Sequence, residues 1–186
     1  MGKRLFVAID ISEEVKQKIQ PVLDLLSELN VDLKIVPSEN LHITLKFLGE
    51  VDKTEIRKIE DKLSLISEKF RNFEINFRQV GGFPSMEKLN VLWVGVENPI
   101  LIELMKNIDD GLNDVRENEH EEVPHLTIAR IKSGRNKEEL IDWLNKVRDK
   151  SFGPMIVDKI ILYESELSSD GPKYEVLDEF LLEVKK

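Results

Sequence analysis

The chain of 186 residues is long enough for one domain, or two small lobes, with a substantial hydrophobic core. It has no cysteine, which excludes disulfides and thiolate metal sites. The net charge of −9 argues against broad non-specific binding to long nucleic acid, because such binding needs a positive field over much of the surface. The sequence shows neither a signal peptide nor an apolar stretch of membrane-spanning length, so we expect a cytoplasmic protein.

The first part of the chain alternates between strand and helix signals. Ser12 is the expected N-cap of a helix, which Pro21 should kink or divide because proline lacks the amide hydrogen. Asp52 and Glu55 resemble a capping box before a second helix. In chain order, the expected elements are a strand at residues 5–9, the helix after Ser12, a strand at residues 33–36, a strand ending at Gly49, a helix with an apolar stripe from Ile56 to Phe70, and a strand at residues 73–78.

The second part repeats this alternation. Asn98 is the expected N-cap of a helix with Pro99 at its first position. Asn136 and Glu139 are expected to begin another capped helix. In chain order, the expected elements are a turn at residues 81–85, a strand at residues 90–96, the helix after Asn98, an acidic segment at residues 117–122 with His120 as an exposed loop histidine, a strand after Pro124, a turn at Ser133 and Gly134, the helix after Asn136, and strands at residues 155–162 and 174–184 around a turn at residues 168–172.

The order of these elements predicts the fold class. Adjacent strands joined by short turns favour antiparallel pairing, so an α+β fold is expected rather than a doubly wound parallel sheet. The elements fall into two similar halves, and no linker rich in Gly, Ser or Pro separates them. We therefore expect a single two-lobed domain over residues 1–186.

One pattern of four residues occurs twice, as His42-Ile-Thr-Leu and as His125-Leu-Thr-Ile. The chain has only three histidines and three threonines, so chance placement of two of each in one frame is about one in a thousand. Residues i and i+2 of a strand share a face, so each histidine points the same way as its threonine. Two such strands side by side would gather two imidazoles and two hydroxyls, although each quartet alone also fits a half-buried strand with a polar edge.

Paired imidazoles suit acid–base chemistry at phosphorus. The pKa of histidine lies near neutrality, so one ring can accept a proton while a second, protonated ring donates one. Threonine hydroxyls could donate hydrogen bonds to phosphate oxygens as negative charge builds up. A zinc hydrolase and a Ser-His-Asp triad are the alternatives, but the sequence offers neither a third patterned zinc ligand nor a Gly-x-Ser-x-Gly motif.

The residues around the two quartets, from Glu39 to Gly49 and from Pro124 to Arg130, resemble the two-histidine phosphoesterase superfamily. The nearest branch is that of the RNA 2′,3′-cyclic phosphodiesterases, also called 2′-5′ RNA ligases, and the similarity runs nearly end to end. The resemblance implies a bilobal, duplicated fold with pseudo-twofold symmetry. It further implies an antiparallel sheet in each lobe, helices on the outside and an active-site cleft between the lobes.

The resemblance also implies roles for the quartet residues. Family members open terminal 2′,3′-cyclic phosphates of RNA to 2′-phosphomonoesters without a metal or other cofactor, and some join tRNA halves through a reversible 2′-5′ linkage. Carried over, His42 is the proton donor to the departing 3′ oxygen and His125 is the base that activates water. Thr44 and Thr127 bind the phosphate, with Arg130 as a cationic helper. The residues themselves do not tell which histidine is the acid.

Strand parity raises a difficulty for Arg130. In a regular strand it would point away from His125 and Thr127, so a bulge, or a strand that ends at Ala129, is needed to bring it to the site. Lys46, in contrast, shares parity with His42 and is a further phosphate-binding candidate.

Further candidates lie outside the quartets. Between His125 and Lys137 the chain carries four cations and no carboxylate, which indicates either an anion nearby or a solvated loop; the cations are Arg130, Lys132, Arg135 and Lys137. Phe6, Phe47 and Phe83 are candidates for stacking on a terminal base, although each also fits an ordinary core position.

The expected partner is an RNA 3′ end that carries a 2′,3′-cyclic phosphate, and a tRNA half is one such end. We expect a monomer without membrane association. Two alternatives remain open at this point: a cyclic phosphodiesterase for a small nucleotide such as ADP-ribose 1″,2″-cyclic phosphate, and a non-catalytic module that binds RNA ends.

Overall fold

The computed structural model describes residues 2–85, 88–116, 123–168 and 171–184. The acidic segment with His120 lies outside these residues. Of the helices that are described, none is long and apolar enough to cross a membrane. The elements, joined by short 3₁₀ turns at Ser38–Asn40 and Lys53–Glu55, are β1 (Lys3–Asp10), α1 (Glu13–Ser27), β2 (Leu33–Ile35), β3 (His42–Val51), α2 (Ile56–Ser67), β4 (Phe73–Pro84), β5 (Leu89–Glu97), α3 (Pro99–Gly111), β6 (His125–Ile131), α4 (Lys137–Val147), β7 (Ser151–Val157), β8 (Lys159–Ser168) and β9 (Gly171–Leu181).

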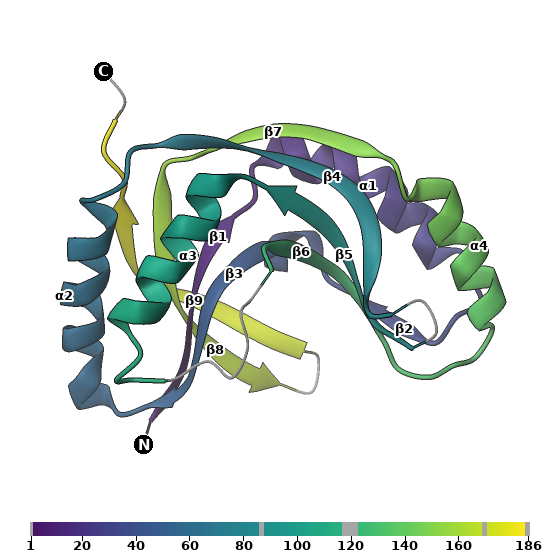
Figure 1. The fold of residues 1–186 in the computed structure, drawn as a ribbon. Helices are drawn as coiled ribbons and strands as arrows, with labels where there is room; N and C mark the ends of the chain where they lie inside the picture. Colours follow the sequence, from purple (N-terminus) through teal and green to yellow (C-terminus); the bar gives the residue numbers. More distant parts are fainter. Residues whose placement is uncertain (1, 86–87, 117–122, 169–170, 185–186) are drawn as a thin grey trace.

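The strands form one curled antiparallel sheet with the order β7-β4-β5-β6-β3-β1-β8-β9, and β2 pairs with β6 (Figure 1). Its two halves, β7-β4-β5-β6 and β3-β1-β8-β9, meet where β3 pairs with β6. The register of that junction consists of Ile43 opposite Leu126. The predicted α+β fold with an antiparallel sheet in each half is confirmed, and the two half-sheets join through β3 and β6 into one sheet.

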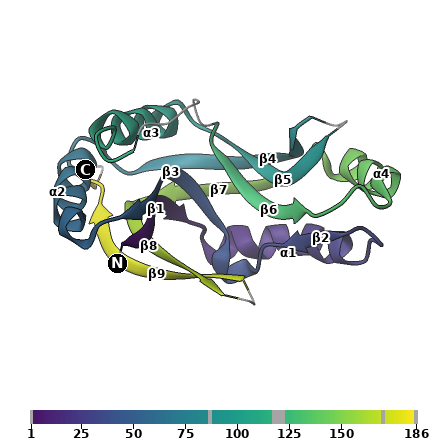
Figure 2. The ribbon, with the colours of Figure 1, turned by 90° about the horizontal axis from the view of Figure 1, so that it is seen from below.

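The two halves repeat the same succession of elements. β1-α1-β3-α2 in the first corresponds to β5-α3-β6-α4 in the second, and β1 pairs with β3 as β5 pairs with β6. α2 and α3 contact β3, β8 and β9, whereas α1 contacts β7 and α4 contacts β4. Figures 1 and 2 show this separation, with α2 and α3 at one end of the molecule and α1 and α4 at the other. The helices leave the inner face of the sheet uncovered, and the candidate active site lies on that face.

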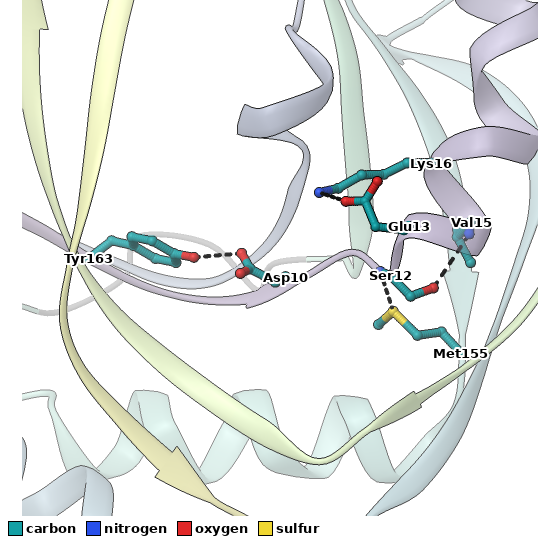
Figure 3. A network of polar contacts seen from close by, with 7 residues as sticks. All are labelled: Asp10, Ser12, Glu13, Val15, Lys16, Met155 and Tyr163. Carbon is teal, nitrogen blue, oxygen red and sulfur yellow. Dashed lines mark hydrogen bonds and ion pairs between the residues drawn. The ribbon is translucent and has the colours of Figure 1, made fainter.

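Two predicted helix starts are confirmed. The Ser12 hydroxyl accepts a hydrogen bond from the Val15 amide at 3.4 Å (Figure 3), and the Asn98 side chain accepts one from the Ile100 amide at 2.6 Å. Each cap satisfies a helix amide that has no partner within the helix. Of the two effects expected of Pro21, a kink or a division of the first helix, the division does not occur, because α1 runs on from Glu13 to Ser27.

Two predicted caps act differently from what their spacing suggested. Asp52 accepts from the Thr54 amide at 2.9 Å and so caps the 3₁₀ turn rather than α2. Asn136 precedes α4 in a left-handed conformation (φ 52°) and makes no side-chain cap. Its amide group instead donates to the Asn30 carbonyl at 2.6 Å, which fastens the loop before α4 to another segment.

The predicted turn at residues 81–85 is wrong, because β4 continues through both glycines to Pro84. Instead, the glycines let side chains of the neighbouring strand lie close to the β4 backbone. A Cβ on Gly81 would lie 2.3 Å from the Trp93 ring of the neighbouring strand, so glycine lets that ring lie across β4. The actual break is a bulge at Gln79, whose φ is 64°.

The single strand predicted at residues 155–162 is also wrong. It comprises the end of β7 and the start of β8, which Asp158 separates. β7 pairs with β4 and β8 pairs with β1, so the chain passes here from one half of the sheet to the other. Both pieces are mostly apolar, and periodicity alone does not separate them.

The close approach at Gly81 gives a stability prediction. Gly81→Ala should lower the free energy of unfolding by about 1–3 kcal/mol, because the methyl group overlaps a rigid indole. Gly134→Ala is the matched control, since a Cβ there meets no atom within 4 Å. Urea unfolding of both variants measures the difference, and equal stabilities would contradict the packing described here.

Candidate active site

A cavity of about 520 Å³ opens on the inner face of the sheet, a volume typical of small-molecule sites. Residues from both quartets line it, together with neighbours from both ends of the chain. Its polar and aromatic lining comprises Arg4, Phe6, Lys34, Asn40, His42, Thr44, Phe47, Thr127, Arg130, Ser165 and Tyr174. Three of these side chains are cationic and none is a carboxylate, so the cavity suits an anion despite the negative charge of the whole protein.

The junction of the two half-sheets aligns the quartets. Ile43 and Leu126, the second residue of each quartet, face each other and are fully buried. In an antiparallel pair this register puts His42 on the side of Thr127 and, likewise, Thr44 on the side of His125. The structure thus brings the four predicted residues together as two His/Thr pairs related by the pseudo-twofold. His42, Thr44 and Thr127 line the cavity itself, and His125 is close enough for its charge to act on His42.

Both imidazoles are held in the same way. Nδ1 of His42 lies 2.7 Å from the Asn40 carbonyl, and Nδ1 of His125 lies 2.7 Å from the Val123 carbonyl, in each case two residues earlier. A carbonyl oxygen can only accept, so Nδ1 carries the hydrogen in both rings. Nε2 is therefore the atom through which each histidine can accept or donate a proton.

Aromatic rings support each imidazole. Phe6 lies 5.0 Å from His42 between ring centroids, and Tyr174 meets the same imidazole edge-on at 5.3 Å. Phe83 meets His125 edge-on at 5.2 Å. These contacts restrict rotation of the rings, so the Nε2 atoms are fixed before any ligand arrives.

The surroundings of His42 shift its titration. Burial lowers the pKa of His42 below its ordinary value, and the charges of Arg130 and His125 lower it further. The hydrogen bond to Asn40 and the carboxylate of Asp10 oppose this shift. His42 is therefore mainly neutral near pH 7 while the cavity holds no anion.

Asp10 links His42 to the adjoining strand. It is the register partner of His42 in the β1/β3 pair, and it accepts a hydrogen bond of 2.5 Å from the Tyr163 hydroxyl (Figure 3). Burial and this bond raise the pKa of Tyr163, so the phenol stays a donor. Tyr163 also stacks on Phe6, with 5.2 Å between centroids, so the carboxylate and the aromatic support of His42 belong to one packed unit.

Each quartet has a β-bulge at its fourth residue, directly after the threonine, which resolves the difficulty of Arg130. The β5/β6 register skips from Thr127 to Ala129, leaving Ile128 unpaired, and Arg130 therefore returns to the face of Thr127 and lines the cavity. The bulge that the Arg130 assignment required is present.

The equivalent bulge on β3 removes Lys46 from the candidates. The β1/β3 register skips from Thr44 to Lys46, so Lys46 faces the helices, is fully buried and pairs with Asp109 of α3. The expectation that Lys46 approaches the phosphate assumed an unbroken alternation and is corrected here. Phe47 takes the cavity-facing position instead, as the counterpart of Arg130.

The three aromatic candidates have different surroundings. Phe6 is only 3% exposed and packs on His42, so its ring has little free surface for a base. Phe47 lines the cavity, but the Arg4 guanidinium lies 4.7 Å above its ring. Phe83 contacts His125 and Trp93 and is not part of the cavity lining.

Several cavity residues were not predicted from the sequence. Arg4, Lys34 and Tyr174 line the cavity from β1, β2 and β9. No local pattern marks them, since only the sheet topology brings these strands beside the quartets. Within the described part of the chain, no group of three or more His, Asp or Glu side chains gathers as a metal site would require.

Comparison with known proteins places this architecture. A family model described as "LigT like Phosphoesterase" matches residues 9–93 and again residues 94–174, so the two matches divide the chain much as the duplicated halves do. The chain is 39% identical over 178 residues to a protein of Methanocaldococcus jannaschii named RNA 2′,3′-cyclic phosphodiesterase, covering 95% of this chain and 99% of the relative.

Two further matches extend over nearly the whole chain. A protein of the same name from Methanothermobacter thermautotrophicus is 34% identical over 184 residues, which cover 98% of this chain and 100% of the relative. The crystal structure of the protein TT0787 of Thermus thermophilus has a TM-score of 0.85 and 26% identity, covering 98% and 100% of the two chains. The chain therefore belongs to the LigT-like phosphoesterase family.

Proposed function

We propose that this protein is an RNA 2′,3′-cyclic phosphodiesterase that opens the cyclic phosphate at an RNA 3′ end to a 2′-phosphomonoester. The observation that carries the proposal is the pair of anchored histidines, each with Nδ1 bound to a carbonyl and Nε2 left for proton transfer. Two relatives that share a third or more of the sequence carry the name of this activity.

The reaction needs one base and one acid. Nε2 of His125 takes a proton from water, and the oxygen of that water attacks phosphorus in line with the departing 3′ oxygen. Nε2 of His42 gives its proton to the departing 3′ oxygen. The P–O3′ bond therefore breaks, and the phosphate stays on O2′. The assignment of acid and base follows the family resemblance. Neither step uses a metal or another cofactor.

The phosphate is held by groups that face it from both halves. The hydroxyls of Thr44 and Thr127 donate to the non-bridging oxygens, where negative charge increases in the transition state. Arg130, which the bulge at Ile128 turns towards the cavity, adds a fixed positive charge. Lys46 has no part in this proposal because it is buried against α3.

The lowered pKa of His42 fits the role of an acid that becomes protonated when its anionic substrate binds. An anion near the ring favours the imidazolium, so phosphate binding raises the pKa of His42 towards and above its ordinary value. The proton is then in place when the leaving oxygen needs it.

Ligation is the same ring opening with an RNA 5′-hydroxyl in place of water: this hydroxyl loses its proton and attacks phosphorus, the P–O3′ bond breaks, and O3′ takes a proton. Hydrolysis and 2′-5′ ligation use the same base, the same acid and the same leaving oxygen, so RNA ends such as tRNA halves are the proposed partners for both. A small cyclic nucleotide such as ADP-ribose 1″,2″-cyclic phosphate is the competing substrate, and competition between it and an RNA end decides between them. Tight binding of the RNA end without turnover would favour a binding module instead.

Replacing either histidine should abolish turnover. An oligoribonucleotide with a 2′,3′-cyclic phosphate is incubated with the wild type, His42→Ala or His125→Ala in excess chelator, and the product end is identified. We expect a 2′-phosphate from the wild type and a loss of at least about 100-fold in each variant, because acid and base act as a unit. A retained cyclic end with the wild type, or a 3′-phosphate product, would contradict the proposal.

The pKa of His42 should respond to its charged neighbours. In an NMR titration of the free protein we expect a value below about 6.5. Arg130→Gln should raise it, since the cation lowers it, and saturating sulfate, whose charge is constant in this range, should raise it further. By linkage, sulfate should bind more tightly as pH falls through this range. Arg135→Gln is the control outside the active-site cavity, and an equal effect of both variants would refute this electrostatic coupling.

A further inference from the structure

A second cavity of about 230 Å³ lies where β6 ends and α4 begins. Four cations line it and no carboxylate does; they are Lys88, Lys132, Arg135 and Lys137. We call this site the basic cavity. Three of its cations belong to the segment between His125 and Lys137 that has no carboxylate. Of the four cations in that segment, the proposed reaction uses only Arg130.

Most of the positive charge of the basic cavity is not neutralised by ion pairs of the described residues. Within residues 2–85, 88–116, 123–168 and 171–184, Lys88 and Lys132 have no carboxylate partner of the kind that many cations elsewhere in the molecule have. Arg135 bonds to the neutral Asn30 side chain at 3.1 Å. In an acidic protein, cations gathered without counter-charges attract an anionic ligand.

The wall of the basic cavity is held in place by hydrogen bonds. The Asn30 side chain accepts from Arg135, and the Asn30 carbonyl accepts from the Asn136 side chain at 2.6 Å. The Lys132 amide donates to the Asp32 carbonyl at 2.9 Å. Asn136, which was expected to cap α4, thus fixes the loop that carries two of the cations.

The basic cavity adjoins the active site along β6. Arg130 lines the active-site cavity, while Ile131 and Lys132 line the basic cavity. Two residues of a strand span about 7 Å, so the two cation groups follow each other at close range. A chain of phosphates whose last member lies between the histidines can reach the second group around the end of the sheet.

We propose that the basic cavity binds the phosphodiester backbone of the RNA upstream of its 3′-terminal nucleotide. This rests on the proposed function, and it adds that the substrate is a single-stranded end of several nucleotides rather than an isolated nucleotide. Backbone phosphates neutralised by lysine and arginine supply affinity without reading sequence. Selectivity for RNA ends over small cyclic phosphates then arises from length.

The first test varies the length of the substrate. Adenosine 2′,3′-cyclic phosphate is compared with oligoribonucleotides of two to six nucleotides that carry the same terminal group. We expect KM to fall as upstream phosphates are added. The slope of log KM against the logarithm of the salt concentration should increase by about 0.7 for each phosphate that is bound. Equal KM and equal salt dependence at every length would overturn the proposal.

Gly134 allows a charge to be introduced without a steric clash. A Cβ there meets nothing within 4 Å, so Gly134→Glu adds a carboxylate to the basic cavity and Gly134→Gln is its neutral control. For the longest RNA we expect KM to rise by roughly fivefold in the Glu variant, the effect of one charge near 4 Å in water, and to stay near the wild-type value in the Gln variant. The mononucleotide should be turned over equally by all three proteins.

A triple variant tests the cations themselves. Lys88→Ala, Lys132→Ala and Arg135→Ala together should remove the advantage of long substrates and leave the mononucleotide unaffected. The control, Lys69→Ala, Arg71→Ala and Lys106→Ala, removes the same charge from exposed positions in or beside the α2 and α3 end of the molecule. If both triple variants lower the oligonucleotide rates equally, only the net charge matters and the basic cavity is not a site.

Failure of the proposed function can be distinguished from failure of the backbone-binding proposal. If the wild type turns over no cyclic phosphate of any length, that function is wrong, and the basic cavity is then tested by binding alone. Fluorescence anisotropy with a hexaribonucleotide that ends in a 2′-deoxynucleotide 3′-phosphate should show weaker binding for Gly134→Glu than for Gly134→Gln. Equal affinities would overturn the backbone site whatever the catalytic result.

Discussion

The contact of Ile43 with Leu126 is the constraint on which the site depends. It is the register pair through which the two half-sheets join, and both side chains are fully buried. A slip of one residue would turn every quartet side chain to the opposite face. Burial of these two residues therefore fixes which side chains meet on the inner face, and the catalytic arrangement is a consequence of core packing.

The duplication then builds the rest of the site, because the same features recur around each quartet and one residue differs between them. Each quartet has the same carbonyl bond two residues back, an aromatic ring against the imidazole and a bulge after the threonine. The residue after the bulge differs, being Phe47 in one half and Arg130 in the other. The backbone is thus similar in the two halves, but only the second half carries the charge of Arg130. Such a difference is needed if one histidine is to act as acid and the other as base.

Much of this could be predicted from the sequence, and the exceptions have physical causes. The fold class and the meeting of the two quartets follow from periodicity and repetition, which are local signals. Lys46 was misplaced because alternation was extended across a bulge, and a bulge depends on the pairing with another strand. The glycines at positions 81 and 82 look like a turn, but they make room for side chains of the neighbouring strand, Trp93 at Gly81 and Leu89 at Gly82. Arg4 and Tyr174 join the cavity through β1 and β9, at opposite ends of the chain, and no local signal can show that.

The exchange of helices between the halves affects how the protein can fold. α1 leaves β1 to cover the other half, and β8 returns at the end of the chain to pair with β1, so that Leu5 lies opposite Glu164. The half that holds His42 therefore lacks a neighbouring strand until residues 159–168 have been synthesised. Pairing at such sequence separation makes folding slow. Neither repeat is a self-contained folding unit, and during synthesis the first histidine strand has to wait for the last hairpin before Tyr174 can join Phe6 against the imidazole.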